Sequence, residues 1–192
     1  MVVEGDWVPI EKLKSKQIYN ILISKRMKLK NDTPSRAHKT ISSIHKSLSA
    51  EERDYWWRLT HKLISTKKAE SKWRRKENGE LVDSVCPACG EEEEDREHYE
   101  FGCRKGVELR QALARKANRE SISREEWQLK KEIMSDELSI MIAKARWLLH
   151  KDRCSIDNKQ KRKMNITALM DKLNRRLALL KASKKEMGSQ LS

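Results

Sequence analysis

The sequence predicts a mainly α protein, with a bundle-like helical body, an inserted Cys/His knuckle and a C-terminal amphipathic helix. The 192 residues include only 6 Gly, 3 Pro and 1 Phe, and Lys, Glu, Leu and Arg are abundant, which favours helices over β structure. Apolar residues recur at helical intervals of three and four along much of the chain. Three of the four cysteines and one of the five histidines lie within residues 86–103, which interrupts this helical pattern.

Composition and charge divide the chain into consecutive segments. The chain length suits one domain or two small ones. We expect residues 12–150 to form one domain, although the basic and acidic residues are unevenly distributed within it. The expected segments are an N-terminal arm (1–11), a basic helical segment (12–76), an acidic knuckle (77–103), a second helical segment (104–150), and a basic linker with the C-terminal amphipathic helix (151–192).

The basic helical segment contains three expected helices, at 14–25, 37–48 and 49–65. The second has apolar residues at 37, 41, 44 and 48, which form a single stripe. Ser49 and Glu52 form a capping box that starts the third helix. Adjacent residues on a helix point about 100° apart, so at most one of Trp56 and Trp57 is expected to be central in the core.

The second half of the chain is also expected to be helical. One helix should end near Asn118, and a capping box of Ser123 and Glu126 starts either one long helix to 150 or two that meet near 135–136. Residues 151–163 are polar and predict a linker. The last helix either packs on the body or docks a partner through one leucine-rich stripe: Ile166, Leu169, Leu173, Leu177 and Leu180.

The cysteine and histidine spacing is the most specific signal in the chain. Cys86, Cys89, His98 and Cys103 follow the pattern C-x2-C-x8-H-x4-C. Thiolates and a neutral imidazole at such spacing suit tetrahedral Zn2+, and four protein ligands make the site structural and not catalytic. The alternatives are a redox Cys-x-x-Cys pair and reduced cysteines placed by chance.

The charge predicts a polyanionic partner. The formal net charge is +14 and the sequence pI is about 9.7, values typical of nucleic-acid-binding proteins, although a merely soluble or ribosome-like basic protein also fits. The knuckle holds ten acids and one base, a charge of −9, so the remainder carries +23. The acidic knuckle is therefore expected to hold the architecture or to dock a basic partner, and not to face phosphates.

Basic runs punctuated by an aromatic residue are the candidate nucleic-acid contacts. Such residues would bind phosphates without reading sequence, and the alternative for any single run is an ordinary solvated surface. The candidates are Lys25, Arg26, Lys28, Lys30, Lys67, Lys68, Lys72, Trp73, Arg74, Arg75, Lys76, Lys159, Lys161, Arg162 and Lys163.

A family resemblance covers roughly residues 12–155. The sequence Cys-Pro-x-Cys-Gly, the glutamate run, the stretch 97–101 and then Cys103 resemble the zinc-binding domain that follows the reverse transcriptase in LINE-like, non-LTR retrotransposons. The flanking stretches 16–22, 56–63 and 145–153 resemble that domain too. The resemblance implies that Cys86, Cys89, His98 and Cys103 are the zinc ligands and that the region is a nucleic-acid-binding appendage. No polymerase, endonuclease or RNase H segment accompanies it, which implies a retroelement remnant or a host protein built from its tail.

These observations predict a non-enzymatic, zinc-stabilised nucleic-acid-binding module derived from a retroelement. The alternative is an interaction or scaffold subunit that docks a catalytic partner through the C-terminal helix and the acidic knuckle. No phosphate loop, G-x-S-x-G, H-E-x-x-H or deaminase signature occurs, and we expect no small-molecule substrate. No secretory signal or membrane span is visible. Cys154, the one cysteine outside the candidate ligand set, argues against a disulfide framework and favours a reducing compartment, the nucleus before the cytoplasm.

Overall fold

The computed structural model describes residues 2–3, 6–7, 36–76, 78–131, 134–157 and 164–189. The chain forms two compact units, Met1–Pro34 and Ser35–Ser192, a division that differs from the segment boundaries expected from sequence. In the first unit, β1 (Val2–Val3) pairs antiparallel with β2 (Asp6–Trp7), with Val2 opposite Trp7. The helix expected at 14–25 lies outside the described residues.

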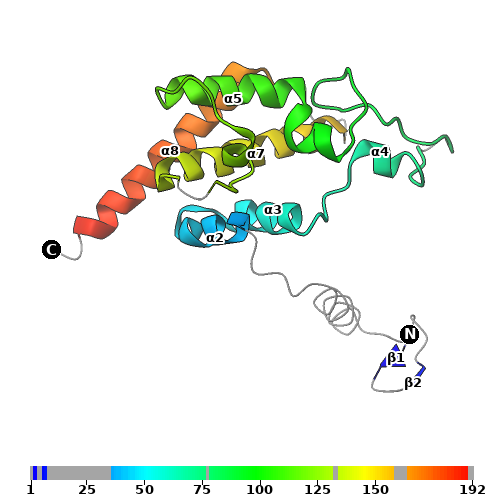
Figure 1. Ribbon diagram of the computed structural model, residues 1–192, viewed down its shortest axis with the longest axis horizontal. Coiled ribbons are helices and arrows are strands. Elements are labelled where there is room, and N and C mark those ends of the chain that lie inside the picture. The colour runs from blue at the N-terminus through cyan, green and yellow to red at the C-terminus, as the bar shows by residue number, and fades with distance from the viewer. Residues whose placement is uncertain are drawn as a thin grey trace. The chain divides into compact units, whose positions relative to one another are not determined.

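The second unit confirms that the protein is mainly helical. In Figure 1, α7 runs through the middle of this unit, with α3 on one side and α5 on the other, and α8 packs against α5 and α7. The elements in chain order are α2 (Arg36–Ser43), η2 (His45–Ser47), α3 (Ala50–Thr60), α4 (Lys67–Glu70), η3 (His98–Gly102), α5 (Arg104–Lys116), α6 (Arg124–Trp127), α7 (Asp136–Asp157) and α8 (Ile166–Ser189).

The start of α3 forms as expected. The Ser49 side chain accepts a hydrogen bond from the Glu52 amide, and the Glu52 carboxylate accepts one from the Ser49 amide, so the capping box is complete. Trp56 is buried and Trp57 is 40% exposed, so only one of the two tryptophans enters the core. The Trp56 indole donates to the Ala143 carbonyl at 3.2 Å and thereby ties α3 to α7.

The helix α7 is buried on all sides over residues 138–148. Such a helix lies in the centre of a domain, whereas a surface helix buries only one stripe. Even Lys144 and Arg146 are buried within this stretch. The Lys144 ammonium binds the Glu52 carboxylate at 2.8 Å, and Arg146 donates to the Trp127 carbonyl at 3.1 Å.

The structure resolves one open expectation for the second half of the chain and corrects another. The capping box at Ser123 and Glu126 is present, but α6 ends at Trp127, so the segment forms two separate helices. The expected linker begins too early, because α7 continues to Asp157. The added turns are stabilised by burial of Asp152 and Arg153, each with an oppositely charged partner on another segment.

The helix α8 packs on the body. Leu169 and Leu173 are completely buried, and Ile166, Leu177 and Leu180 are half-buried against the same core. The Arg176 guanidinium also reaches Glu52 on α3 at 3.1 Å. Of the two roles expected for the leucine stripe, the burial of Leu169 and Leu173 favours packing on the body over partner docking, because these two side chains have almost no exposed surface.

Candidate metal centre

The first two cysteines lie on a tight turn. Val85 forms an isolated antiparallel bridge with Glu93, and the Cys86 amide donates to the Glu92 carbonyl at 2.8 Å, so an extended ladder leads into the turn. The Gly90 amide then donates to the Cys86 carbonyl at 2.7 Å. Gly90 has a φ of +78°, a conformation that glycine adopts without steric cost.

The other two candidate ligands lie at the ends of a π-helical turn. His98 begins η3, and Cys103 follows it as the residue that caps α5. The Cys103 amide donates to the His98 carbonyl at 2.8 Å, which closes the turn and brings the two side chains together. The Asp95 carboxylate accepts from the His98 amide at 2.8 Å and fixes the start of the turn.

The four side chains converge on one buried point. Their ligand atoms all lie within 4.8 Å of one another. The Sγ atoms of Cys86 and Cys103 are 3.9 Å apart, and Cys89 Sγ lies 3.4 Å from His98 Nε2. A tetrahedral zinc site has edges of about 3.8 Å between thiolates and about 3.6 Å between thiolate and imidazole. The expected ligand set is therefore close enough to hold a metal ion, and none of the four cysteines forms a disulfide.

Glu92 orients the imidazole. Its Oε2 lies 2.9 Å from His98 Nδ1, although its side chain is 70% exposed. When Nδ1 carries the proton and donates it to the carboxylate, Nε2 is left with a lone pair that points at the cysteines. Metal-binding histidines are commonly fixed by a carboxylate in this way.

Cys103 is the more acidic thiol of its pair. The hydrogen bond with Cys86 and the backbone amides of Gly106 and Lys105 lower the pKa of Cys103 to about 5. The same hydrogen bond raises the pKa of Cys86. The amides that face Cys103 belong to the first turn of α5, where the N-terminus of a helix stabilises negative charge.

The acidic run of the knuckle is paired with cations of the chain itself. The sequence predicted that the acidic knuckle holds the architecture or docks a basic partner. Five carboxylates between residues 91 and 100 contact arginine or lysine side chains from outside or within the knuckle, which favours the first of these roles. The pairs are Glu91–Arg104, Glu93–Lys68, Glu94–Arg153, Glu97–Arg124 and Glu100–Arg96. Four of these partners lie on α4, α5, α6 and α7, and Arg96 lies within the knuckle, so the run connects the knuckle to the helices.

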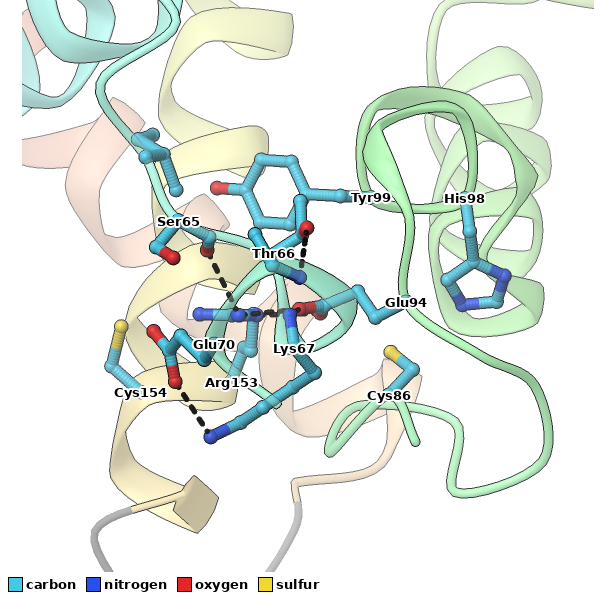
Figure 2. Close-up of polar contacts among 12 residues, drawn as sticks. Ser65, Thr66, Lys67, Glu70, Cys86, Glu94, His98, Tyr99, Arg153 and Cys154 are labelled. Atoms are coloured by element: carbon cyan, nitrogen blue, oxygen red, sulfur yellow. Dashed lines mark hydrogen bonds and ion pairs between the residues drawn. The ribbon is translucent and has the colours of Figure 1, made fainter. Parts of the chain in front are cut away.

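Glu94 is the buried member of this run (Figure 2). Its Oε1 accepts from Arg153 Nε at 2.6 Å, and its Oε2 accepts from the Lys67 amide at 2.9 Å and from Arg153 Nη2. Its carbonyl accepts from the Lys68 amide at 3.1 Å. One glutamate thus joins the knuckle to α7 and to the first turn of α4.

The candidate nucleic-acid contacts between residues 67 and 76, on α4 and directly after it, differ in burial and in ion pairing. Lys67 is buried and bonded to Glu70, so it cannot be the exposed phosphate contact that the sequence indicated. Lys68, Arg74 and Lys76 each bind a carboxylate. The members that remain exposed without an ion pair in the described part of the chain are Lys72, Trp73 and Arg75. Lys25, Arg26, Lys28, Lys30, Lys159, Lys161, Arg162 and Lys163 lie outside the described residues.

Sequence reasoning missed two arginines beside the metal centre. Arg110 is buried over the Phe101 ring, with 3.8 Å from Cζ to the ring centroid, and Arg146 lies 5.1 Å from the Trp56 ring. Burial and the nearby Arg146 charge lower the pKa of Arg110 to about 10. Cation–π contacts and carbonyl acceptors stabilise both guanidinium groups. Nothing in the local sequence separates these arginines from exposed ones.

His150 connects α7 to the knuckle and to α3. Its Nδ1 lies 2.9 Å from the Tyr99 hydroxyl, and its ring stacks on Tyr55 with centroids 4.8 Å apart. Burial, with the charges of Arg153 and Arg58, lowers the pKa of His150 to about 4. The imidazole is therefore neutral at pH 7, and its Nδ1 shares a hydrogen bond with the Tyr99 hydroxyl.

Comparison of the chain with protein-family models, with curated proteins and with solved structures finds no match in any of the three. Within the described residues, the helices are all too short or too polar to traverse a lipid bilayer.

Proposed function

We propose that this chain is a non-enzymatic, zinc-stabilised nucleic-acid-binding module. The observation that carries the proposal is a buried Cys3His cluster whose acidic surroundings are already paired with the chain's own cations. The cluster supplies the metal site. The pairing reduces the free negative charge that would repel a polyanion.

The donor set favours zinc. Three thiolates and one imidazole in a tetrahedral arrangement match structural zinc sites, whereas magnesium and calcium prefer oxygen ligands. All four positions come from the protein, so no position remains for a catalytic water. Metal analysis of the purified protein should give one equivalent of zinc per chain. Less than half an equivalent, after purification without chelator, would overturn the zinc assignment.

The charge balance supports a nucleic-acid partner. Each ion pair of the knuckle consumes one acid and one base, so it leaves the net charge of +14 unchanged. That excess lies on lysines and arginines outside the pairs, including the basic runs at 25–30 and 159–163. Cations spread over several segments bind phosphates with affinity that depends on counter-ion release.

A salt titration tests the proposal. The full chain is titrated onto a fluorescein-labelled oligonucleotide, and binding is followed by anisotropy between about 50 and 200 mM salt. Several phosphate contacts predict a loss of affinity of at least about 100-fold over this range. Absence of binding at the lowest salt concentration would overturn the proposal.

The alternative proposal, an interaction subunit of a nucleic-acid-modifying complex, has less support. Leu169 and Leu173 are buried, and the knuckle carboxylates are largely paired. It would be favoured if the isolated chain bound no oligonucleotide but bound one together with a co-purified protein. The retroelement origin and a nuclear location stay predictions from the resemblance and the composition.

A further inference from the structure

A small surface beside the knuckle combines exposed apolar side chains with exposed cations. Trp73 is 66% exposed, and Leu81 and Val85 are each 45% exposed. Lys72 and Arg75 are exposed next to them in the chain. We call these five residues the hairpin surface.

The backbone that carries this surface is ordered by hydrogen bonds. Arg75 and Leu81 face each other in an antiparallel bridge. The Val82 amide donates to the Arg74 carbonyl at 3.0 Å, and the Lys76 amide donates to the Glu80 carbonyl at 2.6 Å. Because these bonds flank the Arg75–Leu81 pair, its two side chains lie close together on one face of the ladder.

The carboxylates of this segment are occupied by other cations. The Glu70 carboxylate binds Lys67 at 3.1 Å and Arg74 at 3.0 Å. The Asp83 carboxylate binds Lys76 at 3.3 Å. Among the residues that the structure describes here, Glu70 and Asp83 are therefore each paired with a cation outside the hairpin surface.

Lys72 and Arg75 have no carboxylate partner among the residues that the structure describes. Arg75 Nη1 donates to the Gly79 carbonyl at 2.8 Å, which holds the guanidinium on the hairpin. A guanidinium has five N–H donors, so one internal bond leaves donors for an anion. The ring of Trp73 thus lies between two cations in the sequence, both of which remain able to bind phosphate.

We infer that the hairpin surface binds unpaired nucleotides of single-stranded nucleic acid, a deepening that rests on the proposed function. The indole of Trp73 stacks on a base, and Lys72 and Arg75 bind the phosphates on either side of it. In a duplex the faces of the bases are covered by their neighbours, so the exposed indole would have no stacking partner. An apolar protein partner would leave both cations without a counter-ion.

The test compares single-stranded and duplex probes on the full zinc-loaded chain. The probes are a labelled 15-nucleotide oligo(dT), the matching oligo(U), and an oligo(dA)·oligo(dT) duplex. The variants are Trp73→Ala, Trp73→Phe and the control Trp57→Ala, which removes a tryptophan that is 40% exposed on α3 and tilts over His61. Zinc content and helical circular dichroism verify that each variant folds.

Trp73→Ala is expected to weaken binding to the single strand by about 10-fold, the loss of one base–aromatic stack, and to leave duplex binding unchanged. Trp73→Phe should retain most of the affinity, and Trp57→Ala all of it. A larger effect on oligo(U) or on oligo(dT) identifies RNA or DNA as the partner. Equal effects of Trp73→Ala on single strand and duplex, or no effect on either, would overturn the inference while the proposed function stands. If the unmodified chain binds none of the probes, the proposed function fails as well.

Discussion

The knuckle and α7 are stabilised in different ways. Apart from Ala88, the buried apolar cluster of the knuckle consists of its three cysteines, which are also candidate metal ligands. The helix α7 buries eleven consecutive residues in the main core. An apolar core persists without a cofactor, whereas a cluster made of ligands does not. We therefore expect the proposed metal and the ion pairs to hold the knuckle, while hydrophobic burial holds the body.

Metal removal should have the largest effect and should be confined to the knuckle. With chelator, or in Cys86→Ser, the knuckle loses a metal contribution on the order of 10 kcal/mol, and its amides should exchange rapidly in hydrogen–deuterium exchange. The amides of α7 should stay protected because their core contains no metal ligand. Global loss of protection throughout α7 would show that the two regions are not independent.

Glu94→Gln tests the junction between the knuckle and α7, where Glu94 binds Arg153. The substitution leaves the buried Arg153 guanidinium without its counter-charge, which typically costs about 3–5 kcal/mol in the free energy of unfolding. Glu91→Gln is the matched control, since its partnership with Arg104 is exposed and is worth about 0–1 kcal/mol. Urea unfolding of zinc-loaded protein measures both variants. Equal effects would contradict the structural role assigned to Glu94.

Leu173→Ala tests whether α8 belongs to the body. Leu173 is completely buried, so its truncation should lower the free energy of unfolding by about 2–5 kcal/mol, whereas Leu179→Ala, at a position 70% exposed on the same helix, should change it by less than about 0.5 kcal/mol. Thermal unfolding reports both. If neither substitution destabilises the chain, α8 does not pack as described.

The effect of His150→Gln on the pH dependence of stability should be the smallest of these, beside a pH-independent loss of the contacts with Tyr55 and Tyr99. The folded pKa is about 4 and the ordinary value is 6.5, so between these values the unfolded chain binds a proton that the folded chain does not. Stability therefore falls as pH drops from about 6.5 to about 4. The variant cannot take up this proton. The slope of its unfolding free energy against pH should therefore be shallower over that window, by the equivalent of up to one bound proton. Parallel pH profiles at saturating zinc would refute the assignment.

Features encoded by neighbouring residues were predictable from the sequence. The capping boxes at Ser49 and Ser123 each depend on a partner three residues away, and both are present. The metal-ligand set fits within eighteen residues, so its spacing alone brings the side chains into one candidate site. Helical geometry also predicted that at most one of Trp56 and Trp57 is central, and only Trp56 is buried.

Features that depend on distant partners were not predictable. Glu94 pairs with Arg153 across 59 positions, and Glu52 with Lys144 across 92. No local pattern distinguishes these charges from solvated ones. The sequence therefore predicted that the knuckle is an acidic island and that residues 151–163 form a polar linker. The leucine stripe of α8 was equally ambiguous, because a stripe does not identify what covers it.

The complete burial of α7 has a consequence for the tolerance of this sequence to change. Most helices accept substitutions on their outer face, and related sequences then drift at every third or fourth position. Between residues 138 and 148 no such outer face exists. Sequence drift should therefore be restricted along this entire stretch. Its two internal cations, Lys144 and Arg146, can be replaced only together with their partners. These are the Glu52 carboxylate, which neutralises Lys144, and the Trp127 carbonyl, which accepts a hydrogen bond from Arg146.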